Sequence, residues 1–470
     1  MPQQGDDAAA SPPAYQRTTL WGSVKRAVSA TAQSSPPRLA LIIFAGFISV
    51  VSVLLMMPWA SASGRSAQVH DAVFVATSAV SVTGLTPVNT AEHWSLGGQI
   101  VILAAIQVGG LGILTLASLV AISVTHHLGL RTRLVAQEGM ASGPLGEVGS
   151  LIKTVVICSV VVQAALAAVL IPRMMMLEDS PAAGAWHGLF YSISAFNNAG
   201  FVIHPDGLAG VENDPLVLWT IMIGVFLGSL GFPVLLLLWR YRLVLKRWSL
   251  HTKITMEFTV AFMVLGAIAY ALLEWNHADT LGPMDTWEKL QNSLFASVMM
   301  RSGGFSVVDN IMEHSETMLV TNALMFVGGG SASTAGGIKV TTFAVILLAF
   351  IAEARGHEES SAHGRTIPAQ AVRVAISVVA MAATFILIST LTLIILTGED
   401  LERPLFESIS AFATAGLTSG LTEELPPAGL YVLSGLMFAG RVGIMTFAAA
   451  LTIRHSRTRY RYPEGRPIIG

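Results

Sequence analysis

Four short stretches of the chain carry the residues whose types and spacing could do chemistry. Each begins with phenylalanine and reaches, nine or ten residues later, a glycine that is followed by leucine or phenylalanine. The glycines recur about every 110 residues, so the chain is built of four related units. The stretches are FVATSAVSVTGLT (74–86), FYSISAFNNAGFV (190–202), FASVMMRSGGFSV (295–307) and FESISAFATAGLT (406–418).

The chemistry that such stretches could do is the binding of a dehydrated monovalent cation. Glycine lacks a Cβ atom and adopts backbone angles that other residues avoid, so it can present main-chain carbonyl oxygens at a tight turn. Rings of carbonyl oxygens can replace the hydration shell of an ion such as potassium. A single glycine-containing loop would be unremarkable between membrane spans, but four in register predict a shared filter. The candidate ligands are the oxygens of Ser81, Val82, Thr83, Gly84, Asn197, Asn198, Ala199, Gly200, Ser302, Gly303, Gly304, Thr414, Ala415 and Gly416.

The elements that must position these turns are membrane helices. The chain is 53% hydrophobic and only 12% charged, about half the charged fraction of a soluble domain. Long apolar runs flank every stretch, whereas a stretch of about 11 residues is too short to cross the bilayer and must return on the same side. The sequence therefore predicts an all-α membrane protein with four span–pore helix–span repeats around a pseudo-fourfold pore, and eight transmembrane helices.

The four repeats are expected at 39–125, 149–247, 253–356 and 369–454. A tail at 1–38, rich in Pro, Ser, Ala and Gln, has the composition of a disordered segment, and a second tail follows at 455–470. Taking alternate ends of the spans, one side holds about three-quarters of the 27 Lys and Arg, which the positive-inside rule assigns to the cytoplasm. We expect a multi-pass protein of the cell membrane with both termini cytoplasmic.

A glycine-rich segment, GGGSASTAGGIK (328–339), interrupts the second span of the third repeat. Glycine inside a helix costs about 1 kcal/mol relative to alanine, so five glycines should break the helix here. Unwound backbone at membrane depth is tolerated where it lines a pore. A phosphate-binding loop would need Gly-Lys-Ser/Thr after a strand, and this segment lacks that pattern. Nucleotide binding at this segment is therefore disfavoured, and nucleic acid is not an expected partner of the protein. The candidate gate residues are Gly328, Gly329, Gly330, Ser331, Ser333, Thr334, Gly336, Gly337 and Lys339.

Two basic residues fall within predicted spans, Lys339 and Arg441. An ionisable group inside a membrane is a candidate for function. Either could repel cations or hold the glycine-rich segment by hydrogen bonds. The alternative is that each long side chain extends to the cytoplasmic interface.

Other side chains give weaker signals. Histidines 70, 93, 187, 204 and 277 lie in outer segments without close metal-ligand spacing, which favours solvent-facing roles over metal binding. No Ser-His-Asp or His-Glu-x-x-His arrangement falls in a span, so an intramembrane enzyme is disfavoured. A secondary carrier would show inverted repeats and usually an intramembrane carboxylate, whereas these repeats share one orientation and their filter segments carry none.

From about Leu39 onward the chain resembles the Trk/Ktr/HKT superfamily of potassium transporters. The resemblance rests on AVSVTGLT, AFNNAGF, RSGGF and AFATAGLT, including the Arg-x-x-Gly-Phe variant of the third unit. Eight spans without an added N-terminal pair, and the tail RYPEGRPIIG, are similar to the KtrB branch. Gly303 departs from the family, which usually has alanine there. All four filter glycines are kept, which in this family implies potassium selectivity.

The resemblance implies channel-like potassium uptake by a homodimer in which each chain has its own pore. It also implies a cytoplasmic ring of nucleotide-binding RCK subunits of the KtrA type. In this family the broken region beneath the filter is a gate, and Arg441 matches the arginine just below the filter. The sequence leaves open whether sodium stimulates transport and which nucleotide regulates it.

Overall fold

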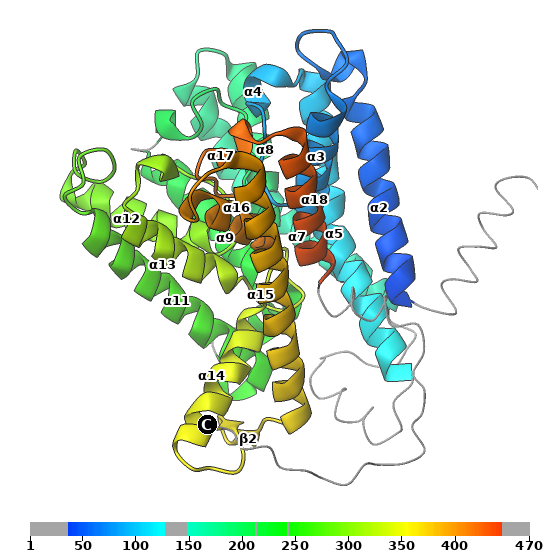
Figure 1. The fold of residues 1–470 in the computed structure, drawn as a ribbon, viewed down its shortest axis with the longest axis vertical. Helices are drawn as coiled ribbons and strands as arrows, with labels where there is room; N and C mark the ends of the chain where they lie inside the picture. The colour runs from blue at the N-terminus through cyan, green and yellow to red at the C-terminus, as the bar shows by residue number, and fades with distance from the viewer. Residues whose placement is uncertain (1–35, 127–147, 212–213, 242–243, 444–470) are drawn as a thin grey trace, which may run out of the picture.

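The protein is helical almost throughout (Figure 1). The structure, a computed structural model, describes residues 36–126, 148–211, 214–241 and 244–443. The predicted C-terminal tail and all but the last three residues of the predicted N-terminal tail lie outside this range, as does the end of the predicted fourth repeat.

Ten helices in the described part of the chain lie where the sequence predicts spans. The predicted spans correspond to single helices or to helix pairs joined by a break. The ten helices are α2 (Pro36–Leu55), α5 (Leu96–His126), α7 (Val148–Leu177), α9 (Pro215–Leu230), α10 (Phe232–Tyr241), α11 (Leu250–Glu274), α13 (Ser315–Phe326), α14 (Val340–Ala354), α15 (Ala369–Thr397) and α18 (Pro427–Val442).

Every glycine-containing stretch begins within a short helix. The leading phenylalanine of each stretch is buried in one of two apolar clusters, which anchors the helix among its longer neighbours. These helices, all longer than the 11 or so residues expected, are α3 (Val69–Ser81), α8 (Pro181–Asn197), α12 (Thr286–Met300) and α16 (Glu402–Ala413).

The starts of these helices follow from local sequence. The Ser180 side chain accepts a hydrogen bond from Ala183 N, with Pro181 at the first helical position of α8. Asp285 and Glu288 form a capping box at the start of α12. Such caps satisfy amide groups that have no partner within the helix.

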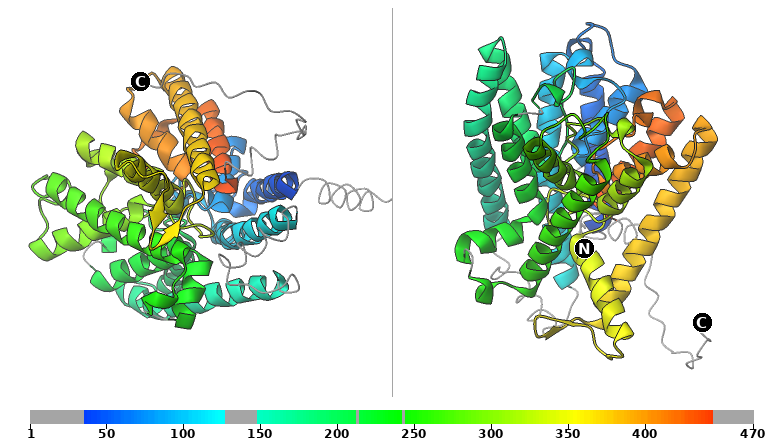
Figure 2. Two further views of the ribbon diagram at one scale, coloured as in Figure 1. Left: turned by 90° about the horizontal axis from the view of Figure 1, so that it is seen from below. Right: turned by 90° about the vertical axis from the view of Figure 1, so that its left-hand side faces the viewer.

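The helix groups close into a ring. α3 packs on α2 and α5, α8 on α7 and α9, α12 on α11 and α13, and α16 on α15 and α18. Between groups, α5 packs on α8, α9 on α12, α13 on α16 and α18 on α3. Seen from below, the colours follow one another around the molecule from blue through green to orange (Figure 2, left).

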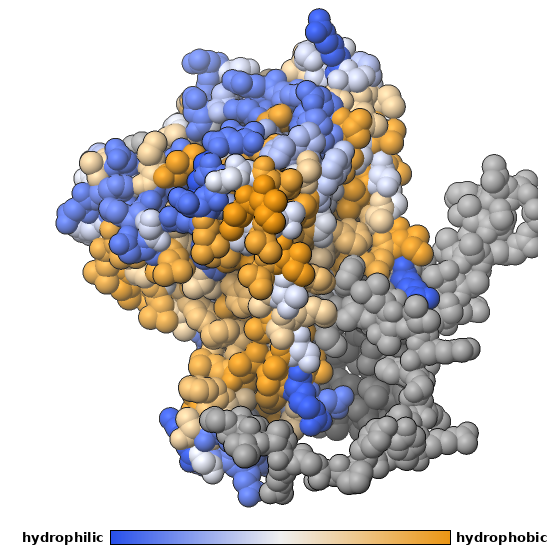
Figure 3. Space-filling view, viewed as in Figure 1, coloured by the Kyte–Doolittle hydropathy of each residue, from blue (hydrophilic) through white to orange (hydrophobic). Residues whose placement is uncertain are grey.

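The surface has the polarity of a membrane protein. Hydrophobic residues form a broad belt across the face in Figure 3, with hydrophilic residues above it and at the lower end. Large apolar side chains such as Leu272, Phe350 and Ile395 are 77%, 69% and 74% exposed. Among the described residues, three segments are long and apolar enough to cross a membrane: Lys153–Leu177, Leu250–Glu274 and Ala369–Thr397.

A fourth candidate span is bent, which the sequence analysis did not predict. α9 and α10 meet at Gly231 with an angle of 103° between them. Gly231 has a φ of 91°, and a Cβ atom there would collide with the carbonyl oxygen of Ser331. The bend thus exists where the glycine-rich segment presses against α9.

The remaining elements are single turns and one small hairpin, so the expectation of a purely helical chain needs a minor correction. The hairpin follows α14 at the lower end of Figure 1. These elements are η1 (Pro58–Ala60), α4 (Thr90–His93), η2 (Ala209–Val211), η3 (Leu245–Arg247), η4 (Asn310–Met312), α17 (Leu421–Glu424), and the antiparallel strands β1 (Ser361–Ala362) and β2 (Arg365–Thr366).

Candidate functional site

The four filter glycines lie against one another in chain order. All have a positive φ, between 66° and 98°, a conformation that favours glycine. A Cβ atom on any of them would lie closer than 3.0 Å to main-chain atoms of a neighbouring stretch, so only glycine fits. Gly84 faces the oxygen of Ala199, Gly200 faces Gly304, Gly304 faces the oxygen of Ala415, and Gly416 faces the oxygen of Thr83.

The stretches meet through their main chains. The carbonyl oxygen that precedes each filter glycine lies next to the filter glycine of the unit before it, including Gly303, whose oxygen lies 3.0 Å from the Cβ position of Gly200. The contact from Thr83 to Gly416 returns from the first unit to the last and closes the circle. Carbonyl dipoles from four segments are thereby gathered at one place, as a cation filter requires.

Most amide groups of the filter segments donate to their own pore helices. Thr83 N donates to the oxygen of Ser78 and Ala199 N to that of Ser194, both at 2.8 Å, and Ala415 N donates to that of Ser410 at 2.9 Å. The hydroxyl oxygens of Ser78 and Ser410 accept from Gly84 N and Gly416 N. These amides therefore do not compete with an ion for the filter oxygens.

Three pore helices end in a left-handed residue. Val82, Asn198 and Thr414 have φ values of 57°, 60° and 47°. This conformation is tolerated by asparagine but is unusual for the β-branched valine and threonine. Such residues persist where the surrounding structure holds them and are frequent at functional sites. The predicted ligands Ser81 and Asn197 are the last helical residues before these turns.

The third filter segment is built differently. Its helix ends at Met300, and the next residue, Arg301, has a right-handed conformation. Ser302 and Gly303 both donate their amides to the oxygen of Met299. A methyl group on Gly303 would collide with the Met299 sulfur and contact Val225. Glycine at position 303 therefore leaves the space that the Met299 side chain occupies.

An amide network that the sequence analysis did not predict supports the second filter segment. Asn197 Nδ2 donates to Gln107 Oε1 at 2.9 Å and to the oxygen of Ile193. Gln163 Nε2 also donates to Gln107 Oε1 at 2.9 Å. The Asn197 side chain thus joins α8 to α5 and α7.

Apart from Arg441, which lies in α18, the predicted gate residues lie in one non-helical loop, residues 328–339, which we call the gate loop. α13 ends at Phe326 and α14 begins at Val340, so the expected helix break is confirmed. The loop is tied to α9, because Gly330 N donates to the oxygen of Ser229 at 2.7 Å and Thr334 N to that of Gly228 at 3.2 Å. Ser331 and Ser333 bond within the third unit, to the Thr341 hydroxyl and the Gly330 oxygen.

The gate loop lies directly against two filter segments. Thr334 Oγ1 is 3.2 Å from the oxygen of Phe196 and 3.1 Å from Asn198 Oδ1. A Cβ atom on Gly336 would collide with the Thr414 hydroxyl, and one on Gly337 would approach Ala413. These contacts are at the C-terminal ends of the pore helices, so the loop lies below the filter.

Three basic side chains hold the gate loop. Arg441, 4% exposed, donates to the oxygens of Thr334 and Gly109, so the alternative that it extends to the interface is wrong. Lys339 Nζ donates to the oxygen of Ala335 within the loop, at 2.6 Å. Arg301 donates to the oxygens of Gly328 and Thr259. Arg301 lies in the third filter motif, but the motif alone does not reveal this role.

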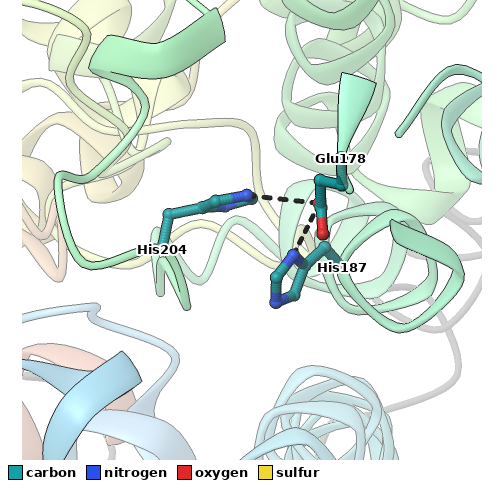
Figure 4. Close-up of side chains that lie close together, drawn as sticks. All are labelled: Glu178, His187 and His204. Carbon is teal, nitrogen blue, oxygen red and sulfur yellow. Dashed lines mark hydrogen bonds and ion pairs between the residues drawn. The ribbon is translucent and has the colours of Figure 1, made fainter. Parts of the chain in front are cut away.

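Some of the outer histidines lie close to glutamates in two groups that could hold a metal ion, which their spacing along the chain did not predict. His187 and His204 lie together with Glu178 (Figure 4). His277 lies with Glu274 and His314. The sequence did not predict these groups because their members are spread along the chain. Each group joins a glutamate at the end of a long helix to a histidine of a later segment.

Known proteins match this chain over nearly its whole length. The Ktr system potassium uptake protein B of Vibrio alginolyticus is 35% identical over 441 residues, covering 93% of this chain and 96% of that protein. The protein of the same name from Bacillus subtilis is 36% identical over 438 residues, covering 93% and 97%. The crystal structure of the potassium transporter TrkH from Vibrio parahaemolyticus has a TM-score of 0.72 at 17% identity, covering 88% of this chain and 84% of that one, and shows a shared fold.

The family predicted from the filter stretches is confirmed by the match of residues 30–461 to the TrkH family, whose description is cation transport protein. Membership identifies a membrane transporter and not an enzyme. The chain belongs to the TrkH family of cation transport proteins.

Proposed function

We propose that this protein takes up potassium across the cell membrane through a channel-like pore. The observation that carries the proposal is the closed circle of main-chain contacts among Gly84, Gly200, Gly304 and Gly416. A filter of carbonyl oxygens needs segments whose main chains approach one another closely. Side chains at the four glycine positions would prevent this approach. Transport is passive, driven by a membrane potential that contributes about 2.3 kcal/mol per charge per 100 mV.

Potassium is the proposed ion for two reasons. Two relatives at 35% and 36% identity are named potassium uptake proteins. All four filter segments also keep their glycine, with the carbonyl oxygens as ligands. Whether sodium stimulates uptake is a separate question. Measurements of potassium flux with and without sodium decide it.

The proposed topology has eight transmembrane helices around a pseudo-fourfold pore. The packing of α5 on α8, α9 on α12, α13 on α16 and α18 on α3 supports this arrangement. The proposed gate is the loop beneath the filter, and hydrogen bonds of Thr334 and Arg441 support this role because they hold the loop next to the filter segments. With an even number of spans both termini lie on one side, which the distribution of Lys and Arg assigns to the cytoplasm.

The proposed assembly is a homodimer in the lipid bilayer, with one pore in each chain and a cytoplasmic RCK regulatory subunit of the KtrA type. The names of the Ktr relatives describe a component of a system, which supports association with further components. Potassium uptake in deficient cells, with and without a KtrA-type subunit, tests this partner. Equal uptake in both would contradict it.

Rubidium uptake into liposomes tests the pore itself. Uptake should saturate with potassium and be lost in Gly304→Asp and Gly416→Asp, because each replacement brings a side chain into main-chain contact. The matched control is Gly64→Asp, since Gly64 also has a positive φ, of 68°, but has no atoms near its Cβ position. Uptake that needs a co-substrate in fixed ratio would instead favour a carrier.

A further inference from the structure

Glu178, His187 and His204 gather at the side of the second unit from three separate elements. Glu178 directly follows α7, His187 lies in α8, and His204 lies four residues after the filter glycine Gly200. Glu178 Oε1 is 2.6 Å from His187 Nδ1 and 3.3 Å from His204 Nε2 (Figure 4). Their potential ligand atoms all lie within 4.8 Å of one another.

This spacing suits a tetrahedral metal ion. Zinc binds histidine nitrogen and carboxylate oxygen at about 2.0–2.2 Å, which places neighbouring ligand atoms roughly 3.3 Å apart. The distance from Glu178 to His204 already has this value. The shorter distance to His187 is that of a hydrogen bond, which widens when an ion replaces the proton between the two atoms.

The Tyr191 hydroxyl orients the His204 ring. It lies within hydrogen-bond distance of His204 Nδ1, the nitrogen that faces away from Glu178. The same hydroxyl accepts a hydrogen bond from Ile203 N at 3.3 Å. Histidine ligands of metals typically donate their second ring N–H to such a partner, which fixes the tautomer. His204 Nε2 is therefore left free to bind.

The Glu178 carboxylate is available because its partners are the two imidazoles. In the described part of the chain, its side-chain hydrogen bonds and ion pairs go to His187 and His204. The second group differs, since Glu274 already accepts from Thr280, Thr317, His277 and the amide of His314. Glu274 is also fully buried. Its role is to hold the outer segments of the third unit together.

The side chains of Glu178, His187 and His204 are 16% to 23% exposed, so an ion can reach them from solution and a water molecule can complete the coordination.

We propose that Glu178, His187 and His204 bind a zinc ion, with Tyr191 as the residue that positions His204. The ion would connect the end of α7, the pore helix α8 and the segment that leaves the second filter turn. His187 would bind through Nδ1, and its proton would move to Nε2. The proposal goes beyond ion transport and concerns binding at a separate site.

Zinc competition with a chelating dye on the purified full-length protein tests the proposal. We expect one zinc per chain, a higher unfolding temperature with zinc, and a loss of affinity in Glu178→Gln and His204→Gln that exceeds the effect of Tyr191→Phe. The Tyr191→Phe loss should be about 10-fold to 100-fold, as for other partners of metal ligands. The matched control is His277→Gln, from the second histidine group, which should bind zinc like the parent protein.

A second variant keeps the test decisive if these replacements prevent folding. His187→Cys retains a metal ligand, so cobalt should bind and give a thiolate-to-cobalt charge-transfer absorption that the parent protein lacks. The native Cys158 is buried and serves as the internal reference. Zinc binding that is equally strong in His277→Gln and His204→Gln, or cobalt binding without this absorption, would overturn the proposal.

Discussion

The Arg441 guanidinium donates to the main-chain oxygen of Thr334, a residue 107 positions earlier in the chain. The same group reaches the oxygen of Gly109, in α5, at 3.4 Å. One side chain of the last unit therefore links the gate loop of the third unit to a helix of the first. Both acceptors are main-chain oxygens, so these two hydrogen bonds do not depend on the side chain of Thr334.

Replacing Arg441 should open the gate. Arg441→Gln removes the positive charge below the filter and the hydrogen bonds that hold the loop. A hydrogen bond to a charged group contributes about 1.5–3 kcal/mol, so the open population should rise roughly tenfold or more. We expect a similar rise in rubidium flux into liposomes, measured per folded protein.

The control for this variant is Arg403→Gln. Arg403 forms ion pairs with Glu399 and Glu424, away from the gate loop, and its side chain is 29% exposed. Its replacement should leave the flux unchanged. An Arg441→Gln flux equal to or below that of the parent protein would mean that the arginine does not hold a closed gate.

Two glycines with the same φ separate backbone strain from the filter contact. Gly200 and Gly207 both have a φ of 66°, but only Gly200 has neighbours at its Cβ position. Alanine adds the left-handed strain of about 1–2 kcal/mol at both positions. At Gly200 it also collides with Gly304 in the next filter segment, where overpacking costs about 1–3 kcal/mol more. Rubidium flux should fall strongly in Gly200→Ala and little in Gly207→Ala, and equal losses would argue against the filter.

The sequence predicted those parts of the site that depend on local backbone chemistry. Glycine at a forced turn leaves a signal within a few residues, and its recurrence after each buried phenylalanine revealed the four units. The glycines of residues 328–339 likewise predicted a helix break by propensity alone. In each case the physical cause lies within the segment itself.

Contacts between distant segments left no such signal. The bend at Gly231 exists because the gate loop packs against α9. A single glycine in an apolar run does not predict such a bend. The bond from Asn197 to Gln107 spans 90 residues. His187 and His204 could not be related from the sequence because the rest of α8 and the second filter turn lie between them along the chain. Such contacts depend on how the helices pack against one another. The hydrophobic pattern of the sequence predicts this packing only in outline.

Thr334 provides a milder test of the same gate. Its hydroxyl shares one proton between the oxygen of Phe196 and Asn198 Oδ1. Thr334→Val keeps the shape and loses this bond, which contributes about 1 kcal/mol, so the flux should rise about fivefold. Asn198→Gly removes one acceptor without strain at a left-handed residue. The double variant should show less than the product of the two effects.

The control is Thr384→Val, in which the lost hydroxyl donates to Ala380 of its own helix at an exposed position. This variant should conduct like the parent protein. Fully multiplicative effects of Thr334→Val and Asn198→Gly would show that the two side chains do not interact in the closed gate.

Glu313, in the segment before α13, should make stability depend on pH. Its Oε1 accepts from the Tyr270 hydroxyl, and its Oε2 is buried without a partner in the described structure. Burial, with further contributions from Glu274 and Asp309, raises the pKa of Glu313 from 4.5 to about 8. Between these values the folded protein keeps a proton that the unfolded chain has released, so stability falls as pH rises through this window.

Glu313→Gln, which is neutral at every pH, should remove this contribution. We expect its unfolding temperature to exceed that of the parent protein at pH 8 and the difference to shrink toward pH 4.5, the ordinary pKa of a glutamate. The control is Glu316→Gln, an exposed position in the first turn of α13, whose unfolding curve should follow the parent protein at each pH. If Glu313→Gln keeps the parent slope, then water or rearrangement solvates this carboxylate and burial does not hold it neutral.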